Sequence, residues 1–355
     1  MNKKLIAAAL AGAFVAPVAM ADVQIYGFIS AGVEHAKATG AAGNVADKDQ
    51  YEGRMRIANE NSRIGFKGSE DLGNGLKAHW QVEQAINVDD SNSSSNWATR
   101  NSFIGLAGGF GDVRLGRHDD AYKLAIDGVG LNVMTNTTAD NGWGNTTWGR
   151  AGSRRNNTAI YFSPNFSGFG VQASYSADET RAYDGNERTD ASIYALAATY
   201  QLEGLKAGLA YSRQNDTKTL ASNDIDAWAL ALSYKFGDTM VGAGYERLDY
   251  DVKGGQDYDQ ASWTIAAAQQ FGAFGLKASY TQLGKAKGLA DADKYKANQW
   301  VLGATYDLSK RTQVLAYATR IDNKDKAAVN FGVNPVTVKA GSNPQAVGVA
   351  LKHSF

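Results

Sequence analysis

Hydrophobic and polar residues alternate along most of the chain beyond residue 22. In 205–212, Leu, Ala, Leu and Tyr occupy one set of alternate positions, and Lys, Gly, Ala and Ser occupy the other. The same period of two recurs in 171–176, 275–281 and 346–355. Because successive side chains of a β-strand point to opposite faces, this pattern predicts strands with one apolar face and one small or polar face.

The composition of the second face separates two kinds of β protein. A soluble β-sandwich would carry many lysines and glutamates there, whereas this chain carries mainly Gly, Ala, Ser and Gln. Aromatic residues stand toward the ends of the apolar faces, as with Tyr211, Tyr234, Tyr280 and Tyr306. A barrel in a membrane needs this arrangement, because its outer face meets lipid, its lumen meets water and its aromatic girdles lie at the interfaces.

Turns and loops between the segments support a barrel. Short turns rich in Gly, Asn and Asp alternate with longer polar stretches, as in bacterial outer-membrane barrels. We predict an all-β fold, a transmembrane antiparallel β-barrel of about 16 strands. The strands are expected near 23–36, 54–70, 75–87, 98–107, 112–120, 154–163, 168–179, 190–201, 205–216, 225–236, 239–252, 259–271, 275–286, 297–308, 311–323 and 344–355.

Composition excludes several other classes of protein. The 355 residues include 36 basic and 36 acidic side chains, which argues against a nucleic-acid partner. The absence of cysteine removes disulfides, thiol catalysis and cysteine-type zinc sites. The stretch starting at Asp249 begins like a calcium loop but has Lys253 where a ligand is needed. We expect no catalytic residues, no metal site and no cofactor.

The first 21 residues are typical of a secretory signal peptide. Lys3 and Lys4 precede a short apolar stretch, and Ala19-Met20-Ala21 supplies the small residues of a cleavage site. The alternative is a buried N-terminal helix. We therefore expect an exported protein whose residues 22–355 form a single barrel domain.

One irregular segment, 121–153, interrupts the succession of strands. It contains six glycines together with Trp143 and Trp148. Connections of this length are usually functional or disordered, and two tryptophans argue against disorder. We predict that the segment folds into the lumen and narrows it; the alternative is an external loop like the others.

Four segments carry a resemblance to a known family. They are an opening strand at 22–28 with Tyr26-Gly27, a hairpin at 62–76, a strand pair at 100–117 and a terminal strand at 349–355 that ends in Phe355. In these segments the chain resembles the Gram-negative general porins of the beta-proteobacterial and neisserial type, and the resemblance extends over the whole of 22–355.

The resemblance implies a homotrimer of 16-stranded barrels, each with its own pore. It also implies a third external loop, here 121–153, that folds inward opposite a row of basic wall residues. The residues matching that row are Arg63, Arg100 and Arg155, with Arg154 replacing Arg155 if the strand starts one residue earlier. The acidic partners on the loop are expected to be Asp127 and Asp140, and next Asp119 and Asp120. Phe355 matches the position of a C-terminal assembly signal.

These features predict an outer-membrane porin that lets ions and small hydrophilic solutes diffuse passively. Its selectivity for charge would be weak and set by wall arginines facing loop carboxylates. Its expected partners are membrane lipid, lipopolysaccharide and the barrel-assembly machinery. The alternatives are a substrate-specific channel, an outer-membrane barrel enzyme and an exported sugar-binding sandwich.

Overall fold

The computed structural model describes residues 23–43, 45–46, 49–90, 96–177, 183–184, 187–188, 191–216 and 224–355. The predicted signal peptide lies outside this range. Helical turns are α2 (Ala121–Asp127) and the 3₁₀ turn η3 (Ala292–Tyr295). The strands are β1 (Gln24–Thr39), β2 (Tyr51–Asn59), β3 (Arg63–Gly73), β4 (Leu76–Ala85), β5 (Ser102–Gly108), β6 (Gly111–Asp119), β7 (Arg154–Phe162), β8 (Phe169–Ala177), β9 (Tyr183–Asp184), β10 (Glu187–Arg188), β11 (Ser192–Leu202), β12 (Leu205–Asn215), β13 (Asp224–Phe236), β14 (Thr239–Asp251), β15 (Tyr258–Phe271), β16 (Phe274–Leu283), β17 (Ala297–Asp307), β18 (Thr312–Asn323) and β19 (Asn343–Ser354).

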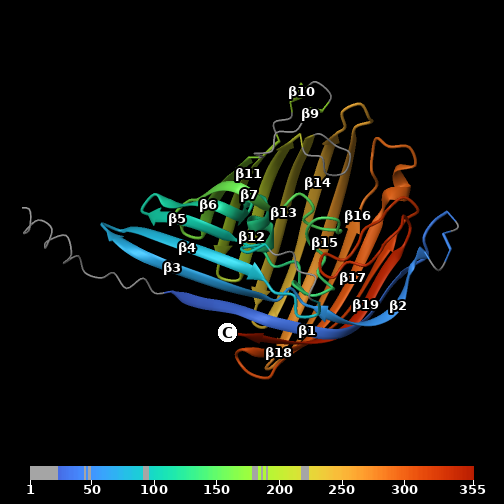
Figure 1. Cartoon of the computed structure of the whole chain (residues 1–355), viewed down its shortest axis with the longest axis horizontal. Coiled ribbons are helices and arrows are strands. Elements are labelled where there is room, and N and C mark those ends of the chain that lie inside the picture. The colour runs from blue at the N-terminus through green and yellow to red at the C-terminus, as the bar shows by residue number, and fades with distance from the viewer. Residues whose placement is uncertain are drawn as a thin grey trace, which may run out of the picture.

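Antiparallel pairing closes the sheet into a ring (Figure 1). β1 pairs with β19 on one side and with both β2 and β3 on the other, and β8 pairs with β11. Since β2 and β3 are consecutive parts of one wall strand, the barrel has 16 strands, which confirms the predicted fold class. The predicted single strand 54–70 is thus split. The break lies at Asn61, which adopts a left-handed backbone with φ of 58°.

The hairpin between β3 and β4 shows why sequence could place the strands. Asn74 and Gly75 both have positive φ, 52° and 76°, which are the angles that a tight β-hairpin turn requires. Two differences from prediction are local. β5 begins at Ser102 rather than near 98, and the short β9–β10 hairpin lies inside a stretch that was expected to be a loop.

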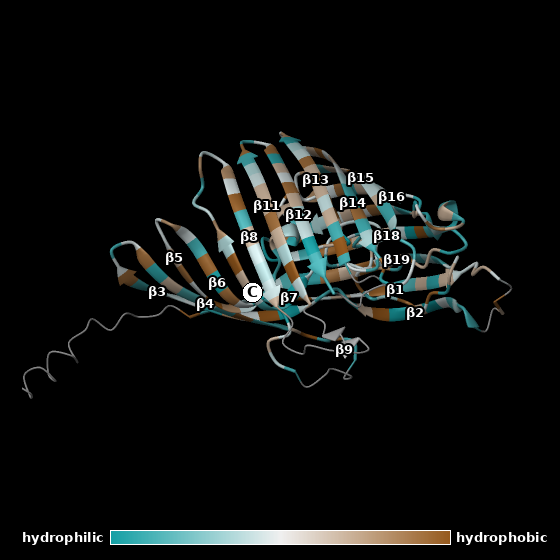
Figure 2. Ribbon diagram, turned by 90° about the horizontal axis from the view of Figure 1, so that it is seen from above, coloured by the Kyte–Doolittle hydropathy of each residue, from teal (hydrophilic) through white to brown (hydrophobic). Residues whose placement is uncertain are grey.

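The two faces of the wall differ as the alternation predicts. Apolar side chains on one face are open to the surroundings of the barrel, with Leu209 53% and Leu302 58% exposed. Figure 2 shows the corresponding alternation of hydrophobic and hydrophilic residues along the strands. No helix in the described part of the chain is long and apolar enough to cross a membrane.

The main apolar core lies inside the ring, where segment 121–153 packs on the inward face of the wall (Figure 1). α2 contacts β8, β11, β12 and β13. Small wall residues permit this close approach: a Cβ on Gly208 would lie 2.5 Å from the carbonyl oxygen of Ala125, and one on Gly242 would lie 2.5 Å from Leu131. Many of the small inward residues therefore accommodate the segment itself rather than water.

The same packing reverses one prediction about β7. Alternation continued from Arg155 would place Ile160 and Phe162 toward lipid, but Ile160 is 1% exposed and Phe162 packs beside it against the core inside the barrel. The reason is that Asn157 has φ of 51°, a local irregularity that interrupts the alternation within the strand. The core also gives this part of the wall an apolar inward surface.

A second apolar cluster fixes the connection between β18 and β19. Val329, Phe331 and Val336 from that connection pack with Ile321 and Leu283 of the wall. The connection also reaches segment 121–153, because the backbone nitrogen of residue 330 donates to the carbonyl oxygen of residue 145 at 3.0 Å. Two connections that are distant in sequence thus meet inside the barrel.

Candidate functional site

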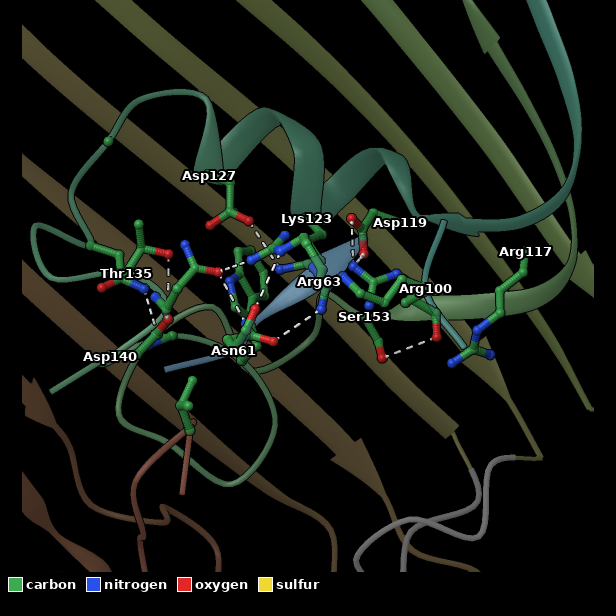
Figure 3. Close-up of a pocket in the computed structure, with 18 residues that line it drawn as sticks. Asn61, Arg63, Arg100, Arg117, Asp119, Lys123, Asp127, Thr135, Asp140 and Ser153 are labelled. Carbon is green, nitrogen blue, oxygen red and sulfur yellow. Dashed lines mark hydrogen bonds and ion pairs between the residues drawn. The ribbon is translucent and has the colours of Figure 1, made fainter. Parts of the chain in front are cut away.

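A cavity of about 590 Å³ lies between the wall and segment 121–153, and it holds most of the expected site residues (Figure 3). Five cationic side chains line it: Arg63, Arg100, Arg117, Lys123 and Arg154. Three acidic side chains line it: Asp119, Asp127 and Asp140. The lining thus carries a formal excess of two positive charges.

Two of the wall arginines share one carboxylate. Arg63 is the first residue of β3, and Arg100 precedes β5. Arg100 Nε lies 2.5 Å from Glu83 Oε1 on β4, and Arg63 Nη1 lies 4.0 Å from the same oxygen. Because one anion faces two cations, the pair keeps a net positive charge. Since β5 starts only at Ser102, strand parity could not have predicted the direction of the Arg100 side chain.

Arg154, not Arg155, lines the cavity. Arg154 is the first residue of β7, and its guanidinium lies 3.1 Å from a carboxylate oxygen of Asp119. Arg155 lies 3.3 Å from the fully buried Asp120, and its Nη2 donates to the carbonyl oxygen of Ala151 at 3.0 Å. The pairing moves two residues along β6, from Gly116 to His118, but three along β7, from Thr158 to Arg155. β7 therefore carries one extra residue, which interrupts the alternation along that strand.

On the loop side, α2 places one cation and one acid in the cavity. Lys123 Nζ lies 2.9 Å from Asp127 Oδ2, one helical turn away, and 3.7 Å from the centre of the Trp143 ring. Burial raises the pKa of the Asp127 carboxyl to about 6, and Lys123 opposes that rise. Figure 3 shows Asp127 on α2 above the central cations Arg63 and Lys123.

Two further acids, Asp140 in the segment and Asp120 immediately before it, maintain the conformation of the segment. Asp140 accepts from the backbone nitrogens of Asn136 and Gly142, each at 2.9 Å, and burial raises its pKa. Asp120 caps α2 by accepting from the nitrogen of Lys123 at 2.8 Å, and it also accepts from the nitrogen of Ser153 at 3.0 Å. Burial raises the pKa of Asp120 as well. Asp120 does not line the cavity, whereas Asp140 lines it with little exposed surface.

Several residues of the site were not among those expected. Lys123 could have been found from its spacing of four residues to Asp127 in a helical stretch. Glu83 could have been found from its place on the neighbouring strand, where it pairs with Gly65, two residues from Arg63 and on the same face. Asn61 and Asn136 gave no signal: Asn136 contacts Arg63 only because segment 121–153 returns to the wall.

Phe355 lies where the ring closes. Its backbone nitrogen donates to the carbonyl oxygen of Gly27 at 3.1 Å, and Gly27 donates back at 3.2 Å. Its role as an assembly signal stays a prediction. Among the residues that the structure describes, no group of three or more His, Asp or Glu side chains could hold a metal ion.

Comparison with known proteins identifies the family. A family model described as Gram-negative porin matches residues 7–326. Outer membrane porin protein 32 of Delftia acidovorans is 30% identical, and the match covers all of both chains. Major outer membrane protein P.IB of Neisseria meningitidis serogroup B is 34% identical, again over all of both chains. The solved anion-selective porin from Comamonas acidovorans is 27% identical with a TM-score of 0.75, covering 94% of this chain and 100% of that one. Porins are channels rather than enzymes, and this chain belongs to the Gram-negative porin family, as a porin of the outer membrane.

Proposed function

We propose that the cavity between the wall and segment 121–153 is the narrowest part of a water-filled passage. Ions and small hydrophilic solutes would diffuse through it down their gradients, with a preference for anions. The observation that carries this proposal is the charge of the lining, which has five cationic and three acidic side chains. With Glu83, which stands behind Arg63 and Arg100, the excess is one positive charge.

The preference follows from electrostatics in a narrow passage. Low-dielectric protein walls focus the field of fixed charges, so a small excess of one sign changes the local concentration of ions. The cations are also held in place: Arg100 by Glu83 and Asn61, Arg154 by Asp119 and Asn101. Fixed donors need little reorganisation when an anion passes. The excess is small, so we expect weak rather than strict selectivity.

The test is to neutralise the three wall arginines together. Arg63→Gln, Arg100→Gln and Arg154→Gln in one protein should move the reversal potential in a salt gradient toward the cation value. The shift should be larger at low salt, because the Debye length is about 30 Å at 0.01 M and about 10 Å at 0.1 M. A reversal potential unchanged by the triple substitution would overturn the proposed selectivity.

Arg320→Gln is the matched control. Arg320 lies opposite Trp300 on the outward face of the wall, where Trp300 is 55% exposed. Its neutralisation removes one charge from the protein but none from the cavity, so the reversal potential should not move. Absence of any current from correctly folded wild-type protein would instead overturn the channel itself.

We also propose that the porin is a homotrimer. A solved outer membrane protein of Vibrio cholerae, described as a trimer form, has a TM-score of 0.68 with 18% identity, covering 94% of this chain and 99% of that one. That likeness supports the shared fold, and the trimer is our inference from it. Mass measurement of the detergent-solubilised native protein should give three chains, and a single-chain mass in mild detergent would contradict it.

A further inference from the structure

Segment 121–153 is tied to the wall by a buried group of carboxyls that the proposed selectivity does not use. Tyr317 on β18 directs its hydroxyl at two glutamates: Glu34 Oε2 on β1 lies 2.8 Å away, and Glu60 Oε1, between β2 and β3, lies 2.5 Å away. Glu34 is 0% and Glu60 is 1% exposed. Two carboxyls that are so deeply buried must have hydrogen-bond partners or lose their charge.

The hydrogen bonds of Tyr317, Glu34 and Glu60 depend on how many protons the three side chains share. A tyrosine hydroxyl has one hydrogen, so it can donate to only one of the two carboxyls. The second short contact is a hydrogen bond only if that carboxyl carries a proton and donates to the tyrosine oxygen. Protonation of one glutamate accounts for both distances.

The surroundings identify Glu60 as the protonated one. Arg56 Nε lies 2.6 Å from Glu34 Oε1, and an arginine at this distance favours the ionised carboxylate. Among the described residues, Glu60 has no ion pair with a lysine or arginine. Its other oxygen, Oε2, accepts from the backbone nitrogen of Thr138 at 3.0 Å. A neutral acid with its hydrogen toward Tyr317 and its carbonyl toward Thr138 satisfies the contacts of both its oxygens.

Glu60 thereby connects the wall to the part of the segment that faces the cavity. Thr138 is two residues from Asn136, whose side-chain oxygen accepts from Arg63. Thr138 also accepts from the side chain of Asn334 at 3.0 Å, in the connection before β19. We propose that Glu60, held as a neutral carboxylic acid, is a positioning residue that keeps Asn136 against Arg63 in the passage. This inference rests on the proposed function of the cavity.

The proposal predicts how pH affects the passage. The titratable groups that face Glu60 are Glu34 on β1, Arg56 on β2 and Tyr317 on β18; the segment contributes only the uncharged Thr138. Deprotonation of Glu60 would leave two buried carboxylates beside one hydroxyl hydrogen. Like charges at that distance repel each other, so the Tyr317 contact would break and the tie to Thr138 would shift. The segment would then fluctuate more as pH rises.

Glu60→Gln tests the protonation state, because an amide imitates a neutral acid. Its NH₂ group can donate to Tyr317, and its oxygen can accept from Thr138. The open-channel current of wild-type protein should become several-fold noisier between pH 6 and pH 9. The current of Glu60→Gln should stay as quiet at pH 9 as wild type is at pH 6.

Glu246→Gln is the matched control at the other tie of the segment. Glu246 is 0% exposed and accepts from Tyr122, Ser262 and the nitrogen of Arg150. With the amide oxygen on the Arg150 nitrogen and Ser262, the NH₂ group of Glu246→Gln faces Tyr122, whose hydroxyl hydrogen then loses its acceptor; Tyr317, by contrast, keeps Glu34. Glu246→Gln should be noisier than wild type at every pH and should retain the pH dependence.

Infrared difference spectra between pH 6 and pH 9 provide a measurement that needs no current. Wild type and Glu246→Gln should lose a carboxylic-acid C=O band on going to pH 9, and Glu60→Gln should not show this band. A band that survives in Glu60→Gln, or a Glu60→Gln channel noisier than wild type at pH 6, would overturn the assignment. If the band behaves as expected but no protein conducts, the proposed channel fails and the assignment of the proton stands.

Discussion

The two sides of α2 are built differently although their residues are neighbours in the sequence. On α2, Tyr122 and Ile126 are one helical turn apart and nearly fully buried against the wall. Lys123 and Asp127, also one turn apart, face the cavity and pair with each other. The spacing of four residues therefore separates a side that fixes the segment from a side that carries charge.

The comparison teaches that charge alone does not identify a residue that acts on solutes. Asp120 caps the start of α2 and Asp127 is its last residue, but Asp120 is 0% exposed and holds backbone nitrogens and Arg155 in place. Asp127 lines the cavity. We therefore expect substitutions on the wall side to change the stability of the segment, and substitutions on the cavity side to change selectivity.

The largest expected effect separates two adjacent arginines. Arg155→Gln removes the cation next to the buried Asp120, and breaking a buried pair in this way costs about 3–5 kcal/mol. Arg154→Gln removes a cavity cation whose partner Asp119 keeps a hydrogen bond from Asn101. We expect Arg155→Gln to lower the midpoint of denaturant-induced unfolding with little change in reversal potential, and Arg154→Gln to do the opposite.

Measurements on Arg154→Gln and Arg155→Gln can contradict the distinction between a structural wall side and a charged cavity side. Equal shifts of reversal potential from both would mean that Arg155 also acts on ions and that the wall side is not merely structural. Loss of stability in Arg154→Gln alone would mean that the roles of the two arginines are exchanged.

A smaller effect is expected at Tyr122. Tyr122→Phe removes the hydroxyl that donates to Glu246 at 2.8 Å and leaves a buried carboxylate one donor short, which costs about 1–3 kcal/mol. Local opening of α2 should become roughly 5- to 150-fold more frequent, measured by hydrogen exchange of its amides. Lys123→Gln, on the opposite side of the helix, should leave exchange nearly unchanged and shift selectivity toward cations. Exchange that rises equally in both variants would contradict a two-sided helix.

The fold was largely predictable because most wall strands show the alternation of apolar and polar residues within their own sequence. Alternation such as that at 205–212 needs no knowledge of distant residues, and β12 forms there as Leu205–Asn215. The split between β2 and β3 was not predictable, since nothing in the sequence around Asn61 indicates that its backbone is left-handed. The inward direction of Ile160 was not predictable either, since the left-handed backbone of Asn157 interrupts the alternation along β7.

The site was predictable only in part, for a related physical reason. Arg63 begins a regular strand, and it lines the cavity. The choice between Arg154 and Arg155 depends on the one extra residue that β7 carries between its pairings with His118 and Gly116, and simple alternation along β7 does not show it. The contact of Glu60 with Tyr317 joins residues 257 positions apart, and only closure of the ring brings them together.

The smallest expected effect concerns the charge of Asp127. Burial raises the pKa of this carboxyl to about 6, so it is ionised above that pH and takes up a proton as pH falls from 7 to 5. The cavity then loses one negative charge, and its excess of positive charge increases. The reversal potential of wild type should move toward the anion value over this interval. In Asp127→Asn the side chain is neutral throughout, so the channel should be more anion-selective than wild type at pH 7 and should change less between pH 7 and pH 5. A pH response of the same size in both proteins would assign the titration to another group and would remove Asp127 from the side that sets selectivity.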